Sequence, residues 1–437
     1  MQASTITCFL HVGRALILTA TLAEAYYSRL RTGVQSIASP GLARQSLPPR
    51  QQRNDSLQRV SRLGATEDYT ATLGARNPKD GRGRNQDGRA LSMTKAAKEG
   101  DVVLKSVKVG PLKQENVYLP SGVSMEALCQ APSTGAAKRS PLPPLVFIHG
   151  SYHAAWCWAE HWMPFLASKG YETYSISLRG TSGTRPPCLE GDGTRIKMKI
   201  SDHVSDVKDF AETMLPGKRP VFISHSFGGI VLLKLMEGLA SDETAGVDED
   251  GERQGSGTLR GIQAKISGGV FLCSVPPSGN GPMTKRFIKE RPVAAVKIVL
   301  GFVLKMATYW PWLARDLFFT KSLEQSALRR YMENFKADSV NGLDLGDLRG
   351  QLPSKFADAD GKAKWIAEAP PRLVIGAERD RLVDKAGIEE MATFLDTEYV
   401  MLPTVPHEVM LGPDWPLGVA RVLQWLEATD FQDTSTT

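Results

Sequence analysis

Cysteine is scarce in this chain of 437 residues, and its few copies are widely spaced. No two of them have the Cys-x-x-Cys spacing of a zinc or redox motif, and the chain is far longer than a small disulfide-stapled scaffold. We therefore expect reduced thiols and no metal site. The five cysteines are Cys8, Cys129, Cys157, Cys188 and Cys273.

The main part of the chain also lacks an excess of positive charge. Residues 1–96 hold 14 Lys and Arg against 6 Asp and Glu, whereas residues 97–437 hold 39 against 41. A protein that binds nucleic acid needs basic residues clustered on its folded part, so we exclude nucleic acid as a partner. The 42% of apolar and 23% of charged residues are ordinary globular values. The length suits one large α/β domain with appendages.

The N-terminal apolar run at residues 15–23 is too short to span a bilayer. Arg14 precedes it and Ala23-Glu24-Ala25 ends it, as at a signal-peptide cleavage site. Residues 26–64 then contain seven Arg and one acid, a composition typical of transit peptides. Together these segments resemble the two-part plastid leaders of algae. We expect residues 1–97 to be a plastid-targeting leader and disordered linker, with mitochondrial import, secretion or plain disorder as alternatives.

From residue 98 onward, strand patterns and helix patterns alternate, which predicts an α/β domain with a mostly parallel, doubly wound sheet. Two short strands joined at Gly110-Pro111 predict an antiparallel entry to this sheet. Ser201 is expected to cap the second helix. The predicted strands are 102–109, 115–119, 145–148, 172–178, 221–223, 268–273, 373–375 and 399–402; the helices are 154–169, 201–215, 228–239, 385–394 and 416–428.

Two insertions interrupt the alternation. Residues 241–261 are acidic, rich in Gly and free of aromatics, which predicts a disordered loop. Residues 282–364 differ, because they contain the apolar stretch 293–319. Lys297, Lys305 and Pro311 lie within that stretch and argue against a membrane span.

The best candidate for a catalytic side chain is Ser226. It lies in the sequence Ser224-His225-Ser226-Phe227-Gly228-Gly229, after an apolar strand and before a helix. A sharp strand-to-helix turn lifts a serine hydroxyl clear of the sheet, and small residues on either side let the turn close. The usual pattern is Gly-x-Ser-x-Gly, and Ser224 replaces its first glycine.

From about residue 145 to its C-terminus, the chain resembles the α/β-hydrolase superfamily. Within it, the chain resembles plant, algal and cyanobacterial plastid-type esterases and methylesterase-like hydrolases. The residues that carry the resemblance are the turn at Ser226, the run Phe147-Ile148-His149-Gly150-Ser151-Tyr152-His153-Ala154-Ala155-Trp156-Cys157-Trp158, and Ser177-Leu178-Arg179-Gly180-Thr181. The resemblance implies an oxyanion hole made by the backbone N–H groups of Ser151 and Phe227. For His149-Gly150 the alternative is a plain tight turn.

The resemblance also implies the order serine, acid, histidine. Only His407 follows Ser226 among the seven histidines, which assigns it as the general base. Three carboxylates follow the strand at 373–375, and the family places its acid four residues beyond Gly376, which selects Asp380. Glu378 lies too near the strand end, and Asp384 is expected to cap the helix at 385–394.

In this fold the segment before the acid-bearing strand forms a cap, here at about 282–364. Its apolar stretch either lines an acyl or terpenoid pocket or packs as an ordinary helix on the core. We expect a serine esterase without a cofactor that acts on a hydrophobic ester, such as a lipid, acyl or phytyl ester. The cap, with Trp310 and Trp312, is a candidate for peripheral membrane contact. The alternatives are a methylesterase, thioesterase or lyase on the same scaffold, or a non-catalytic receptor or carrier.

Overall fold

The computed structural model describes residues 109–133, 142–184, 197–242, 262–338 and 343–431. The predicted leader and linker at 1–97 lie outside these residues. So do nearly all of the predicted strand at 102–109 and nearly all of the predicted loop at 241–261. Those three interpretations stay predictions.

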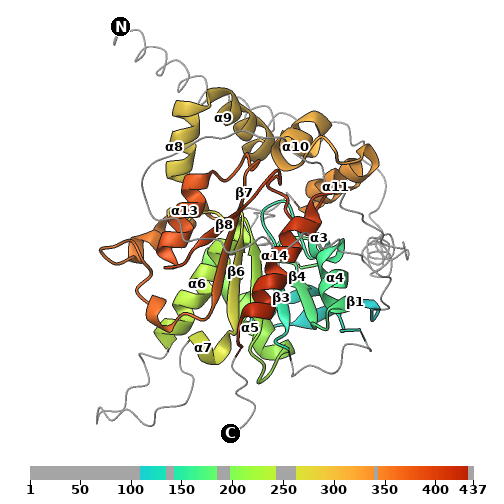
Figure 1. The fold of residues 1–437 in the computed structure, drawn as a ribbon, viewed down its shortest axis with the longest axis vertical. Coiled ribbons are helices and arrows are strands. Elements are labelled where there is room, and N and C mark those ends of the chain that lie inside the picture. Colours follow the sequence, from blue (N-terminus) through green and yellow to red (C-terminus); the bar gives the residue numbers. More distant parts are fainter. Residues whose placement is uncertain (1–108, 134–141, 185–196, 243–261, 339–342, 432–437) are drawn as a thin grey trace, which may run out of the picture.

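One eight-stranded sheet runs through the centre of the molecule (Figure 1), with the strand order β1-β2-β4-β3-β5-β6-β7-β8. β2 pairs antiparallel with β1 and with β4, and all other pairs are parallel. The predicted α/β fold with a mostly parallel sheet is confirmed. The strands are β1 (Leu112–Tyr118), β2 (Ser124–Gln130), β3 (Leu145–Ile148), β4 (Thr173–Ile176), β5 (Val221–His225), β6 (Gly268–Leu272), β7 (Arg372–Ala377) and β8 (Tyr399–Leu402).

The antiparallel entry to the sheet differs from its prediction. It is the β1–β2 hairpin, which turns at residues 119–123, whereas Gly110-Pro111 precedes β1. The sequence of β2, SMEALCQ, lacks β-branched residues and favours a helix on intrinsic propensity. It is a strand because it hydrogen-bonds to β1 on one side and β4 on the other, and tertiary pairing overrides the local preference.

Helices cover both faces of the sheet, and each face has its own core. Phe147 of β3 belongs to one buried cluster with α3, α4 and α14, whereas its neighbours Val146 and Ile148 belong to another with α5, α6 and α13. This alternation is the period-two pattern of a strand buried on both faces. The covering helices are α3 (Trp156–Ala159), α4 (Trp162–Ser168), α5 (Ile200–Met214), α6 (Phe227–Asp242), α7 (Ile262–Lys265), α13 (Lys385–Phe394) and α14 (Trp415–Ala428).

Three helix boundaries test the predicted caps and lengths. The predicted helix at 154–169 is two helices, α3 and α4, which break at Glu160 and His161. The predicted cap Ser201 is wrong, because α5 begins at Ile200 and the Asp202 carboxylate accepts the Lys199 N–H at 2.8 Å. Asp384 caps α13 as predicted, since its carboxylate accepts the Gly387 N–H at 3.0 Å.

The segment between β6 and β7 is helical, and we call it the cap. Helices α8 to α11 gather at one end of the sheet (Figure 1). The apolar stretch 293–319 is not one helix, because Lys305 has a left-handed φ of 59° and Pro311 starts a new helix. No helix among the described residues is long and apolar enough to cross a membrane. The elements are α8 (Asn280–Glu290), α9 (Pro292–Ile298), the π-helix η2 (Val299–Val303), η3 (Met306–Thr308), α10 (Pro311–Phe318), α11 (Gln325–Asp338), α12 (Leu345–Gly350), η4 (Pro353–Phe356) and η5 (Ile366–Glu368).

Candidate active site

Ser226 occupies a one-residue turn between β5 and α6. Its φ of +52° lies in the left-handed region, which is strained for a residue other than glycine and costs on the order of 1–3 kcal/mol. Backbone hydrogen bonds hold it there: its N–H donates to the Leu272 carbonyl at 3.0 Å, and its carbonyl accepts from Gly229 and Val275 at 3.1 Å each. The turn is therefore fixed by its neighbours rather than by its own preference.

Two glycines make room for this turn. A Cβ at Gly228 would lie 2.7 Å from the carbonyl oxygens of Ile148 and His149, so the first turn of α6 passes directly over the end of β3. A Cβ at Gly150 would lie 2.8 Å from Cβ of Ser226. The loop that follows β3 therefore passes immediately beside the candidate nucleophile.

Ser224, the departure from the usual pattern, fits without strain. It is a fully buried residue of β5, and its φ is not among the positive values of the described residues. Its hydroxyl donates to the Val270 carbonyl of the neighbouring strand β6 at 2.9 Å. Because the strained backbone lies at Ser226 and not at Ser224, a serine can replace glycine here.

His407 and Asp380 lie on the loops that follow β8 and β7, and the structure brings them together. Nδ1 of His407 lies 2.7 Å from Oδ2 of Asp380. The other carboxylate oxygen accepts the N–H groups of Leu382 at 2.7 Å and Val383 at 2.9 Å, which fixes its orientation. Among the three carboxylates after β7, Asp380 is the one that contacts the histidine.

The electrostatic surroundings favour the protonated form of His407. Burial by itself lowers its pKa, but the Asp380 carboxylate, by its charge and its hydrogen bond, and the charge of Glu408 act in the opposite direction, and the net result is a raised pKa. Both residues are buried: His407 is 2% exposed and Asp380 is 8% exposed. With Nδ1 facing Asp380, Nε2 is the nitrogen left to accept a proton.

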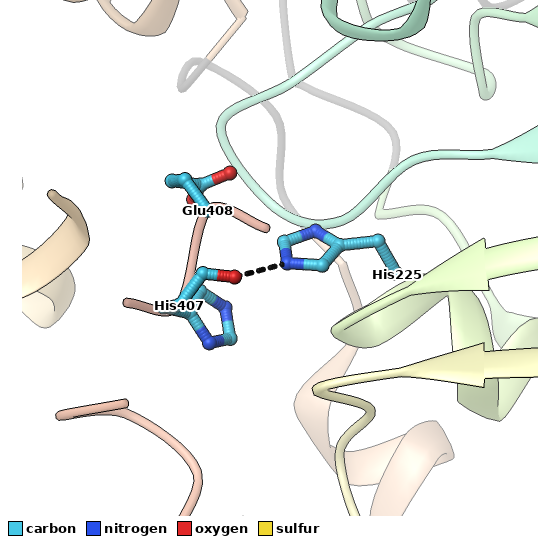
Figure 2. A group of neighbouring side chains, drawn as sticks. All are labelled: His225, His407 and Glu408. Atoms are coloured by element: carbon cyan, nitrogen blue, oxygen red, sulfur yellow. Dashed lines mark hydrogen bonds between the residues drawn. The ribbon is translucent and has the colours of Figure 1, made fainter. Parts of the chain in front are cut away.

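His225, the residue before Ser226, connects the strand-to-helix turn to the histidine loop. Its Nε2 donates to the His407 carbonyl oxygen at 3.0 Å, and the two ring centroids lie 4.7 Å apart (Figure 2). Burial lowers the pKa of His225 to about 3, so this ring is neutral. Within the described residues the Ser226 hydroxyl itself makes no hydrogen bond; a catalytic hydrogen bond often forms only once substrate is bound.

The sequence did not predict a buried contact between Glu408 and His153, which lies next to His407. Oε2 of Glu408 lies 3.0 Å from Nε2 of His153, and Nδ1 of His153 lies 2.8 Å from the Ser151 carbonyl oxygen. Burial alone raises the pKa of Glu408, but the imidazoles of His153 and His225 lower it to about 2. Each of these residues is within two positions of a predicted site residue, but no local sequence pattern indicates that they meet.

The two predicted oxyanion donors flank Ser226. Ser151 follows Gly150 in the loop beside the nucleophile, and Phe227 is the first residue of α6, where helix N–H groups lack intrahelical acceptors. His149 holds this loop: its Nδ1 donates to the Gly150 carbonyl at 2.7 Å, and its Nε2 accepts the Leu178 N–H at 2.9 Å. The hydrogen bond between His149 and Leu178 joins the motif at the end of β3 to the motif that follows β4.

In the part of the chain that the structure describes, two buried groups of side chains have ligand atoms close enough for a metal ion. They are His225, His407 and Glu408, and Cys273, Asp380 and His407. Both use His407, whose Nδ1 already bonds to Asp380, and burial raises the pKa of the Cys273 thiol, which keeps it protonated. The chemistry of these donors suits proton transfer better than metal binding.

Comparison with known proteins shows which family the chain belongs to. The sequence model of the alpha/beta hydrolase family matches residues 145–420. Methyl jasmonate esterase 1 of Vitis vinifera is 30% identical over 94 residues, which are 21% of this chain and 33% of that protein. Norfluorocurarine synthase 2 of Strychnos sp is 26% identical over 151 residues, which are 34% of this chain and 46% of that protein. The matches thus span less than half of these curated relatives.

A solved structure shares the fold over a longer range. Potato (Solanum tuberosum) epoxide hydrolase I superposes with a TM-score of 0.51 at 17% identity, over 73% of this chain and 100% of that chain. At this identity the likeness concerns the fold alone. Together with the family match over more than half of its length, this architecture establishes that the chain belongs to the alpha/beta hydrolase family.

Proposed function

We propose that the chain hydrolyses carboxylic esters, with Ser226 as nucleophile, His407 as general base and Asp380 as its partner. The observation that carries the proposal is the 2.7 Å hydrogen bond between His407 and Asp380, on loops adjacent to the strained turn that presents Ser226. A nucleophile, a base and a group that orients the base are the parts that covalent acyl transfer requires.

The proposed reaction follows from this geometry. The Ser226 hydroxyl attacks the ester carbonyl while Nε2 of His407 takes its proton, and the imidazolium keeps its Nδ1–H on Asp380. The negative charge on the carbonyl oxygen is met by the N–H groups of Ser151 and Phe227. Each such donor contributes on the order of a hundredfold in rate. The alcohol then leaves with the proton from His407, and water attacks the acyl-enzyme in the same way.

The cap supports a hydrophobic ester as substrate. Tyr152, next to Ser151, packs on Phe302 of η2 and Phe318 of α10, with ring centroids 5.0 and 6.0 Å apart. Its hydroxyl also donates to the Phe302 carbonyl oxygen. Aromatic side chains of the cap thus pack on the residue next to the predicted oxyanion donor Ser151. Buried Leu313 and Leu317 show that part of the apolar stretch packs as an ordinary core helix.

A methyl ester of a small hydrophobic acid is the second candidate. It is favoured by the similarity to a protein named methyl jasmonate esterase, over 21% of this chain. A thioesterase, a lyase and a receptor with an intact site remain further alternatives on the same scaffold.

A chain-length series of p-nitrophenyl esters, together with a panel of methyl esters and acyl thioesters, separates these candidates. We expect kcat/KM to rise from acetyl to medium or long acyl chains, because each buried methylene contributes about 0.8 kcal/mol. Preference for methyl esters of compact acids supports the second candidate. Binding without turnover of any of these substrates would contradict ester hydrolysis and favour a receptor.

A further inference from the structure

The outer side of the cap exposes an unusual number of large hydrophobic side chains. Six of the nine such residues in the described part of the chain lie within residues 293–312; the other three, Tyr118, Leu345 and Phe356, lie elsewhere. We call these six the outer cap surface. They are Val293 (70% exposed), Val296 (42%), Val303 (63%), Tyr309 (54%), Trp310 (37%) and Trp312 (56%).

The helical elements in this part of the cap contact one another. α10 contacts α9, η2 and η3, and all of them belong to the cap at one end of the sheet (Figure 1). The rings of Trp310 and Trp312 stack with their centroids 6.0 Å apart. Exposed Trp and Tyr beside aliphatic residues are typical of a surface that meets a membrane interface, because these rings are apolar with one polar edge.

The same segment carries a strong positive charge. Residues 282–321 hold 8 Lys and Arg against 2 Asp and Glu, whereas the rest of residues 97–437 holds 31 against 39. Lys285, Lys289 and Arg291 are exposed beside α9, and one of the two acids, Asp316, bonds to Lys297 at 3.0 Å. A basic segment on an otherwise acidic domain is complementary to an anionic lipid headgroup layer.

The outer cap surface is connected to the candidate site through neighbouring residues. Val303 is exposed, whereas the preceding Phe302 packs on Tyr152, which follows the oxyanion residue Ser151. On α10, the Phe318 carbonyl accepts the N–H of Glu408, the residue after His407, at 3.2 Å. Lipid bound at η2 and α10 would therefore contact the same elements that pack against the Ser151 loop and the His407 loop.

We propose that the outer cap surface docks the protein on an anionic lipid bilayer, from which the site draws its ester. The docking itself follows from the exposed side chains and the charge, and only the ester rests on the proposed function. A second copy of the chain is the competing occupant. It is disfavoured because a two-fold dimer through this surface would set two strongly basic segments against each other.

Vesicle flotation with the full-length chain tests the docking. We expect binding to vesicles of phosphatidylcholine with phosphatidylglycerol, weaker binding to phosphatidylcholine alone, and loss of binding in high salt. The double variant Val303→Ser/Trp312→Ser should lower the partition coefficient by about tenfold or more, because two inserted side chains are lost. Lys289→Gln/Arg291→Gln should weaken binding only to the anionic vesicles.

The matched control is Tyr118→Ser/Leu345→Ser, which removes two exposed hydrophobic side chains that are not part of the outer cap surface and should bind as the wild type does. Equal binding by the wild type and the Val303→Ser/Trp312→Ser variant, or no binding by the wild type, would overturn the proposal. So would sedimentation velocity showing a dimer that this variant dissociates, because the surface would then belong to a second copy.

Hydrolysis of soluble p-nitrophenyl acetate separates this proposal from the proposed function. The surface variants should retain the wild-type rate on this substrate while losing activity on an ester embedded in vesicles. If no ester is turned over but the variant still loses vesicle binding, the docking surface stands and ester hydrolysis fails. If the variant hydrolyses the soluble ester normally and binds vesicles as the wild type does, ester hydrolysis stands and the docking surface fails.

Discussion

Glu408 and His153 meet inside the protein: Oε2 of Glu408 lies 3.0 Å from Nε2 of His153, and both side chains are 1% exposed. The pair joins the loop that carries His407 to the loop that carries Ser151, since His153 also bonds to the Ser151 carbonyl oxygen at 2.8 Å. Because the Glu408 carboxylate is buried and its pKa is lowered, removing the His153 side chain leaves that charge without its partner, which typically costs about 3–5 kcal/mol.

Glu408→Gln is therefore expected to change the pH dependence of catalysis as well as stability. The charge of Glu408 helps to raise the pKa of His407, so its removal lowers that pKa and moves the acid limb of the kcat/KM profile to lower pH. Glu408→Asp keeps the charge and should largely keep the wild-type limb. An unshifted limb in Glu408→Gln would show that the carboxylate has no electrostatic effect on His407.

The stability of the wild type should depend on the same carboxylate. The folded-state pKa of Glu408 is about 2, below the ordinary value of 4.5, so its stabilisation is present above pH 4.5 and is lost as the pH falls towards 2. In denaturant titrations between pH 4.5 and 2, the free energy of unfolding of Glu408→Gln should fall less than that of the wild type. Glu172→Gln, which removes a half-exposed partner of Lys218, is the matched control and should follow the wild type.

Asp380→Asn should lower kcat by about 10⁴-fold with little change in fold. The Asn carbonyl can still accept the N–H groups of Leu382 and Val383, which leaves its NH₂ facing Nδ1 of His407. His407 would then carry its proton on Nε2 and could not accept one from Ser226. Steady-state kinetics and circular dichroism check this, and near-wild-type turnover would exclude Asp380 as the partner of the base.

Much of the regular fold could be predicted from local patterns. The predicted helix at 385–394 and strand at 399–402 coincide with α13 and β8, because apolar periodicity and the Asp384 cap agree there. β2 could not be predicted, since its sequence prefers a helix and only pairing with β1 and β4 makes it a strand. The break between α3 and α4 was not predicted either; His161, which precedes α4, stacks its ring on Trp415 of α14, a contact that no local pattern indicates.

The candidate site was partly predictable for a different reason. The strand-to-helix motif led to Ser226, and the family resemblance led to Asp380 by position and to His407 by chain order; the structure brings the last two into contact. The Glu408–His153 pair could not be found in this way, because no local pattern indicates which distant residues meet in a fold. A buried Glu is costly unless paired, so its partner becomes evident only in three dimensions.

Gly150→Ala should lower kcat by about a hundredfold or more while the protein stays folded. The added Cβ would lie 2.8 Å from Cβ of Ser226, so the loop bearing the Ser151 N–H must move away from the nucleophile. Gly238→Ala on α6 is the control, because a Cβ there meets no atom within 4 Å. Retention of full activity by Gly150→Ala would show that this loop is not part of the oxyanion site.

Ser224→Gly restores the usual Gly-x-Ser-x-Gly pattern and should nevertheless reduce stability. It removes the 2.9 Å hydrogen bond to Val270 and adds chain entropy to the unfolded state, at a cost of about 1 kcal/mol. We expect kcat within about twofold of the wild type, because the strained residue is Ser226. A stability gain in urea denaturation would mean that Ser224 is the strained position.

The central claim is that Ser226 is the nucleophile. Intact-mass spectrometry and peptide mapping after reaction with a fluorophosphonate probe test it most directly. We predict one adduct per chain, located on Ser226, absent from folded Ser226→Ala, and formed in step with the loss of ester hydrolysis. An adduct on another residue, or ester hydrolysis that persists in Ser226→Ala, would contradict the account.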